Sequence, residues 1–255
     1  MATDSYLATT YQHDLATVDD GAELLAAIET VLTAAGWTET AANVWKSPDA
    51  ARFIEVTFTL PAADKLQFVV EDYVSRTFSA RRVGTVDTGL WSIHAGPYFL
   101  YLGGPDANRW GFMGLVDHFP APADSHDRDA YCGGPLDSAD VATSENFGDY
   151  LNWDETGTEY AATPQRVALL VEVTNKVVSR YLNAVGYDWP NVMYARVNVG
   201  GDLHLAGVWY QAIVVDPAMN IGEEFQAPLD IGTLATFRVL SISVHESCKL
   251  AARVA

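Results

Sequence analysis

The residues best suited to chemistry form an acidic and histidine-containing cluster in the segment 117–129. Carboxylates and imidazoles bind divalent cations, and the alternate residues Asp127 and Asp129 would turn the same way in an extended loop. The spacing matches neither an EF-hand nor a zinc motif, so a solvated acidic loop is the competing interpretation. The candidate cation ligands are Asp117, His118, Asp124, His126, Asp127 and Asp129.

Aromatic side chains form a second candidate binding group in the polar segment 118–164. Exposed aromatics in a long loop could stack on sugar rings or anchor a protein partner. The competing interpretation is that they pack this loop onto its own domain, because a long surface loop needs apolar anchors. The residues concerned are Tyr131, Tyr150, Trp153 and Tyr160.

No recognised catalytic motif accompanies these groups. The sequence contains no GxSxG nucleophile elbow, no HExxH pair, no P-loop and no GxGxxG fingerprint. Adjacent carboxylates such as Glu223 and Glu224 would point to opposite faces of a strand, so they would not form a glycosidase pair. We therefore predict a protein that is not an enzyme and that holds no cofactor, unless a divalent cation binds in the segment 117–129.

The charge of the chain limits its partners. Fifteen Lys and Arg residues against 33 Asp and Glu residues give a net charge of −18, with a sequence pI of about 4.4. Such a surface repels phosphate backbones and anionic lipids, so we expect no nucleic-acid partner and no membrane insertion. No apolar run approaches the roughly 20 residues of a membrane-spanning helix.

The acidic residues are spread along the chain and are not gathered in one tail. Lysine is scarce, since only Lys46, Lys65, Lys176 and Lys249 occur. A globally acidic, lysine-poor surface suits concentrated salt, where a Debye length of roughly 3 Å at 1 M removes self-repulsion. A halophilic source is the explanation we favour, and an ordinary acidic protein is the alternative.

One amphipathic helix is predicted near the start of the chain, over residues 20–35. Asp20 is a suitable N-cap with Glu23 three residues later, and Gly36 stands where a glycine commonly ends a helix. Apolar residues recur at helical spacing between these two ends: Leu24, Leu25, Ile28, Val31 and Leu32.

Strand signals dominate the rest of the first half. Residues 37–45 and 52–60 are predicted to form a hairpin around 47–49, with burial on both faces of the second arm, and residues 66–78 alternate in polarity. A central hairpin is predicted from two apolar runs, 98–102 and 110–116, which a turn rich in Gly, Pro and Asp connects. Its apolar character indicates burial on at least one face.

The second half begins with the segment 118–164, which lacks any periodicity and is expected to lie along the surface. Strands are predicted again at 165–174, 191–198, 203–215, 235–244 and 248–254. The chain is thus divided into an N-terminal helix and sheet region (1–117), a long surface loop (118–164) and a C-terminal β region (165–255) that shares the same core. The predicted fold is α+β and mostly β, with the N-terminal helix packed on an antiparallel sheet or sandwich with long loops.

Three places in the chain resemble a family of virion structural proteins of tailed phages and haloarchaeal tailed viruses. The first is Ala34-Ala35-Gly36-Trp37-Thr38 followed by Val44-Trp45. The second is Arg109-Trp110-Gly111-Phe112-Met113-Gly114, with Pro120, Pro122 and the closing Gly133-Gly134. The third is Gly207-Val208-Trp209-Tyr210 with the later Phe237-Arg238-Val239-Leu240. The family's usual Tyr-Pro-Tyr-Pro run is replaced here by acidic residues.

The resemblance implies a non-enzymatic part of a tail, baseplate or neck, located in the virion. Its expected partners are other virion proteins and further copies of the same chain in a symmetric homo-oligomer. No catalytic residue is carried over, because the family defines none. A host-surface or glycan-binding module at the tail tip is the alternative function, and it would use the aromatic residues of the loop.

Overall fold

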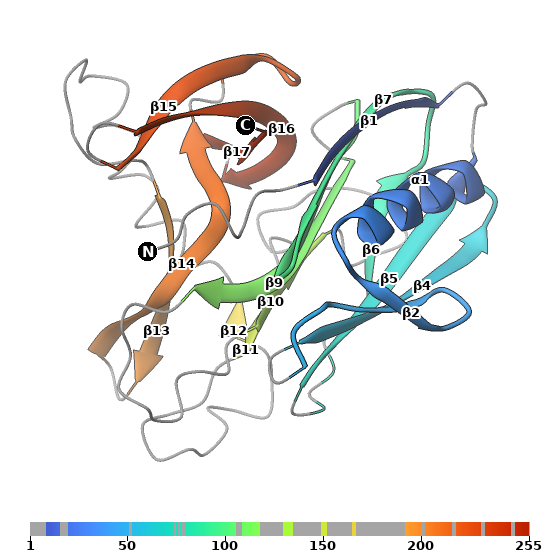
Figure 1. The fold of residues 1–255 in the computed structure, drawn as a ribbon, viewed down its shortest axis with the longest axis horizontal. Helices are drawn as coiled ribbons and strands as arrows, with labels where there is room; N and C mark the ends of the chain where they lie inside the picture. Colours follow the sequence, from blue (N-terminus) through green and yellow to red (C-terminus); the bar gives the residue numbers. More distant parts are fainter. Residues whose placement is uncertain are drawn as a thin grey trace.

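The computed structural model has an α+β, mostly β architecture of antiparallel sheets with one helix in its described part, which confirms the predicted fold class (Figure 1). Two sheets form in the described part, one of five strands and one of twelve. The structure describes residues 9–15, 20–50, 53–73, 75, 77, 80–105, 109–117, 130–134, 149–151, 165–166, 192–199, 202–215, 218–230, 233–245 and 248–254.

Helix α1 (Gly21–Ala34) begins and ends where the sequence predicts. The Asp20 carboxylate accepts hydrogen bonds from the backbone N–H groups of Ala22 and Glu23, which satisfies two donors of the first turn. At the other end Gly36 has a φ of 85°, and the N–H of Trp37 reaches back to the carbonyl of Leu32 at 2.9 Å. This is a Schellman ending, for which glycine is the residue of least strain.

The smaller sheet follows the helix in the order β2-β3-β4-β5-β6. Its strands are β2 (Thr38–Ala41), β3 (Val44–Lys46), β4 (Ile54–Ala62), β5 (Lys65–Asp72) and β6 (Arg81–Thr85). Buried and half-buried residues alternate strictly along β5, as predicted, because successive side chains of a strand point to opposite faces.

Two details of this sheet differ from the prediction. The run 37–45 is not one strand, because Asn43 adopts a φ of 60° and the chain turns there between β2 and β3. The arm expected to be buried on both faces is buried on one: Ile54, Val56 and Phe58 are buried, while Phe53 lies before the strand beneath the Lys46 ammonium group.

The larger sheet joins the two halves of the chain. Strand β9 pairs with β14 through Asp117 with Val208 and Val116 with Trp209, so the C-terminal strands continue the central ones. The main path is β1 (Thr9–Leu15), β7 (Gly89–Gly96), β8 (Phe99–Gly103), β9 (Trp110–Asp117), β14 (Asp202–Val215), β17 (Cys248–Arg253), β16 (Thr233–His245) and β15 (Glu224–Asp230).

Short strands branch from this path, and two of them, β10 and β11, lie within the segment 118–164 that lacks periodicity in the sequence. Strand β10 pairs with β9 and with β11, so part of 118–164 returns to the sheet. The sequence signal is weak because β10 has four residues and β11 three, too few to show a period. The branching strands are β10 (Ala130–Gly133), β11 (Asp149–Leu151), β12 (Gln165–Arg166) and β13 (Val192–Val199).

The predicted central hairpin is β8 and β9, and it is buried on both faces. One face, with Leu100, Leu102 and Met113, joins the core formed by α1 and the smaller sheet. A Cβ added at Gly111 would lie 3.0 Å from the Phe68 ring, so the two sheets approach closely here. Figure 1 shows α1 and the smaller sheet on one side of the central strands and the C-terminal strands on the other.

The opposite face of the same strands is aromatic. Register aligns His94, Tyr101 and Phe112 across β7, β8 and β9, and all three are fully buried. Phe99 stacks on Tyr101, and Trp110 stacks on Phe112. We call this face, made of His94, Phe99, Tyr101, Trp110 and Phe112, the aromatic layer.

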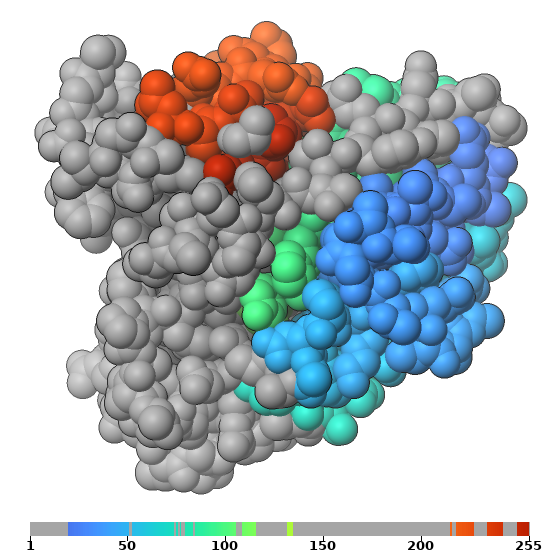
Figure 2. Space-filling model, in the orientation of Figure 1, coloured from blue at the N-terminus to red at the C-terminus, as the bar shows by residue number. Residues whose placement is uncertain are grey.

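Strand β16 crosses the face of the sheet that carries the aromatic layer. A Cβ at Gly103 would lie 3.2 Å from the Leu240 side chain and from the Ser241 backbone nitrogen, so β16 crosses directly over β8. On the surface, the described N-terminal and C-terminal residues occupy separate areas, and a strip of the central strands is visible between them (Figure 2).

Candidate functional site

The predicted cation site is placed only at its first residue. Asp117 is the last residue of β9 and pairs with Val208, so it belongs to a strand and not to the loop in which it was predicted. The described residues contain no group of three or more His, Cys, Asp or Glu side chains able to hold a metal ion. The other candidate ligands, His118, Asp124, His126, Asp127 and Asp129, lie outside the described residues.

The predicted aromatic group is placed at two of its four positions. Tyr131 lies in β10 and Tyr150 in β11, and the register sets these residues directly opposite each other. The pairing of β10 with β11 therefore brings two tyrosine positions of the predicted group to the same register position. Trp153 and Tyr160 lie outside the described residues.

The end of β10 is held against the smaller sheet by a buried arginine that the sequence reasoning missed. Arg81, which is 1% exposed, donates from Nη1 to the carbonyl of Gly134 at 3.2 Å. A Cβ at Gly134 would lie 2.8 Å from the carbonyl oxygen of Arg82, so only glycine fits this contact. The pair Gly133-Gly134 therefore closes the excursion of the chain after β9 at a fixed place.

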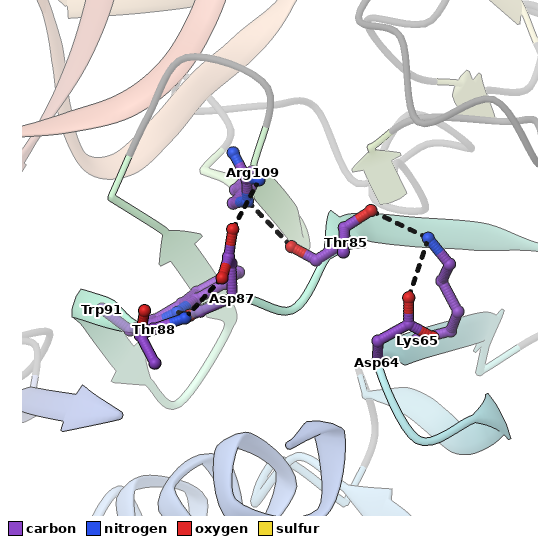
Figure 3. A network of polar contacts seen from close by, with 7 residues as sticks. All are labelled: Asp64, Lys65, Thr85, Asp87, Thr88, Trp91 and Arg109. Atoms are coloured by element: carbon purple, nitrogen blue, oxygen red, sulfur yellow. Dashed lines mark hydrogen bonds and ion pairs between the residues drawn. The ribbon is translucent and has the colours of Figure 1, made fainter. Parts of the chain in front are cut away.

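A polar joint connects the central hairpin to the smaller sheet (Figure 3). Its centre is Arg109, at the start of β9, which donates from Nε to the carbonyl of Thr85 at 2.9 Å. The same guanidinium pairs with the Asp87 carboxylate at 3.1 Å, and the other oxygen of that carboxylate accepts the N–H of Thr88. Arg109 thus contacts both Thr85, the last residue of β6, and Asp87, which lies between β6 and β7.

The polar joint extends in two directions from Arg109. Toward the smaller sheet, Lys65 donates to the Thr85 hydroxyl at 2.8 Å and pairs with Asp64 at 3.5 Å. Toward the C-terminal strands, the Ser241 hydroxyl donates to the carbonyl of Arg109 at 2.8 Å. Residues far apart in the sequence therefore meet at one hairpin turn, and the contacts serve to fix the layers together.

His94 is the one strongly perturbed titratable group among the described residues. Its ring is fully buried, and neither Nδ1 nor Nε2 has a hydrogen-bond partner among them. Burial, with a smaller contribution from the positive charge of Arg238, lowers the pKa of His94 from 6.5 to about 3. The imidazole is therefore neutral at physiological pH. The sequence shows only a histidine in an apolar strand, which does not reveal this burial.

The charged groups described above take part in contacts that fix the fold. Arg109, Lys65 and Arg81 each donate to backbone or neighbouring side-chain oxygens, and His94 is buried as part of the aromatic layer. Comparison with protein-family models, with curated proteins and with solved structures found no match for this chain. Within the described residues, no helix has the length and apolar character needed to cross a membrane.

Proposed function

We propose that this protein is a non-enzymatic structural component of a tailed virus particle, in the tail, baseplate or neck, and that it acts through protein-protein assembly contacts. Its partners are other virion proteins and further copies of the same chain. The proposal joins the sequence resemblance to the positions that the resembling residues occupy in the fold.

The observation that carries the proposal is that all three resembling stretches contact the central strands. The indole N–H of Trp37, from the first stretch, donates to the carbonyl of Gly96 at 2.8 Å, at the end of β7. The second stretch is the start of β9 itself. In the third, Trp209 pairs with Val116 of β9, and Leu240 packs against Gly103 of β8. Motifs that maintain a framework in this way suit a building block better than an enzyme.

The distribution of charge supports the same function. Arginines of the described residues are paired with carboxylates of the same chain, as with Arg109 and Asp87, or Arg238 and Glu224. The excess of acidic residues, giving −18 overall, then remains as a repulsive exterior at low salt. We propose that the chain belongs to a virus of a halophilic host, since concentrated salt would screen that repulsion and allow copies to pack.

The test has two parts, particle content and assembly state. Mass spectrometry of purified virus particles should detect this chain at a fixed ratio to the major tail proteins. Native mass spectrometry and light scattering of the purified full chain, in low and in molar salt, should show a closed ring or a weak oligomer that salt favours. Absence from the particles together with a monomer at every salt concentration would contradict the proposal.

The opposed pair Tyr131 and Tyr150 favours a second candidate, a host-surface or glycan-binding module at the tail tip. Two aromatic residues at one point of a sheet provide the kind of platform on which a sugar ring stacks. Electron microscopy with an antibody against the chain would then label the free end of the tail. Replacing Tyr131 and Tyr150 by serine, or Trp153 by alanine, would abolish adsorption without removing the chain from particles. An assembly defect in these variants would favour the first function.

A further inference from the structure

The position of His94 distinguishes it from an ordinary buried histidine. It lies in β7, opposite Tyr101 of β8, on the face of the sheet that β16 crosses. The surrounding aromatic layer supplies ring carbons and few polar atoms, and Tyr101 and Phe112 are fully buried with it. The imidazole therefore lies between the central strands and the C-terminal strands, where a change in its charge affects the contact between them.

The two unpartnered ring nitrogens make the protonated, charged form of His94 unfavourable in free energy while the ring is buried. Neither nitrogen has a hydrogen-bond partner among the described residues, although an imidazolium ring carries two N–H donors. A buried charge without partners is among the largest penalties in a protein interior. Exposure to water would remove this penalty, so proton binding is strongly linked to opening of the layer.

Among the groups on the elements around His94, the positive charge of Arg238 increases this linkage. From β16, Arg238 places a positive charge near the ring, and it is paired with Glu224 of β15. From β8, Tyr101 supplies a phenol ring opposite His94. On β1, Thr10 is the register partner of His94, and Asp14 lies farther along the same strand. Helix α1, with Glu23 and Glu29, packs on the opposite side of the sheet.

We propose that His94 is an acid-sensitive latch between the central strands and the C-terminal strands: proton uptake by its ring releases β15, β16 and β17 from the aromatic layer while α1 and the smaller sheet stay folded. Two observations support a local release. The smaller sheet shares its core with the opposite face of the central strands, where Phe68 and Val83 approach Gly111. Arg238 belongs to the strand that would leave, so separation also relieves repulsion between the two cations.

The experiment is hydrogen exchange measured by mass spectrometry on the full chain between pH 7 and about pH 4.5, at constant molar salt. Exchange is corrected for the intrinsic rate at each pH. If only the open state takes up the proton near the ordinary histidine pKa of 6.5, opening of the segment 233–254 rises about 50-fold between pH 6.5 and pH 4.5. Peptides from β4 and β5 should keep their protection over the same range.

Matched variants separate the latch from general acid denaturation. His94→Phe keeps a ring in the aromatic layer but cannot bind a proton, so the 50-fold rise should disappear. His126→Gln removes a different histidine and should keep the full rise. Glu224→Gln removes the partner of Arg238 at every pH and should keep the pH slope.

Should His94→Phe fail to fold, ¹³C NMR of the wild-type histidine rings at falling pH replaces it: His94 should remain neutral until the C-terminal strands open. Three results would each overturn the proposal. The first is an equal acid response in wild type and His94→Phe, and the second is titration of His94 while the C-terminal strands are still closed. The third is loss of protection in β4 and β5 at the same pH.

Discussion

Strand β5 of the smaller sheet and strand β8 of the central layer are both apolar, but they bury different numbers of faces. In β5, Val70 is fully buried while its neighbour Val69 is half-buried, and the alternation continues along the whole strand. In β8, every residue from Phe99 to Gly103 is buried. A strand with one covered face thus alternates between apolar and polar residues with a period of two. A strand that is covered on both faces is a continuous apolar run in the sequence.

The difference shows what each region contributes. The smaller sheet needs one apolar face, so its other face is free to carry the charge of the chain. The central hairpin has no free face and instead connects the helix layer to the C-terminal strands. Polar groups near it, such as Arg109 and His94, are consequently found in joints and buried layers and not at an open surface.

The largest effect is expected from consecutive substitutions in β8. Leu100→Ala and Tyr101→Ala remove side chains from opposite faces, and each should lower the free energy of unfolding by about 3 kcal/mol or more, because both leave cavities in packed layers. Urea unfolding measures both values. Leu234→Ala, at a side chain that is 63% exposed, is the control and should change stability by less than about 0.5 kcal/mol. A small cost for either β8 variant would contradict burial on both faces.

The next effect is the pH dependence of the aromatic layer. The pKa of His94 is lowered in the folded state, so its stabilising contribution is complete above pH 6.5 and is lost as the pH falls toward 3. Between pH 7 and about pH 4.5, wild type should lose roughly 3 kcal/mol more than His94→Phe. Urea unfolding at each pH gives the difference, and carboxylates common to both proteins cancel. Parallel curves would show that the ring does not titrate on unfolding.

A smaller effect distinguishes the two faces of β5. Val70→Ala should cost about 2 kcal/mol, because the side chain is fully buried against the helix layer. Val69→Ala, one residue earlier, should cost less than about 1 kcal/mol since it is half-buried. The two substitutions are chemically identical, so the ratio of their costs in thermal or urea unfolding reports the alternation directly. Equal costs would mean that β5 resembles β8.

The smallest effect concerns the polar joint. Asp87→Asn removes the charge that pairs with Arg109, whose side chain is 19% exposed beside a carboxylate that is 40% exposed. A partly solvated pair of this kind contributes about 1 kcal/mol or less, and salt screens it. Stability of variant and wild type should therefore converge as NaCl is raised to molar concentration. A loss that persists in molar salt would assign the joint a larger role than a surface ion pair has.

Local features of the fold were predictable from the sequence. The residues Asp20 and Gly36 predicted both ends of α1, because caps satisfy backbone groups within one turn of the chain. The alternation of β5 and the two runs of the central hairpin were equally visible, since strand geometry imposes its period on neighbouring residues. The turn at Asn43 was missed, because a left-handed asparagine has no signal as strong as that of a glycine.

Most of the candidate site could not be predicted in this way. Acidic and aromatic residues near 117–164 were visible as types, but the strand position of Asp117 and the opposition of Tyr131 and Tyr150 depend on pairings with β14 and between β10 and β11. Nothing in the residues around Arg81 or Ser241 indicates that they reach Gly134 and Arg109.

The sequence by itself determined the helix with its caps, the alternating outer strand, the apolar central hairpin and the acidic exterior. Each of these depends on residue type and on spacing within one element, where backbone geometry is the same in every protein. Only the tertiary structure decided that β9 pairs with β14, that Arg109 holds two layers, and that His94 is fully buried. Such contacts join residues distant along the chain, and their energy depends on burial that arises only when the layers close.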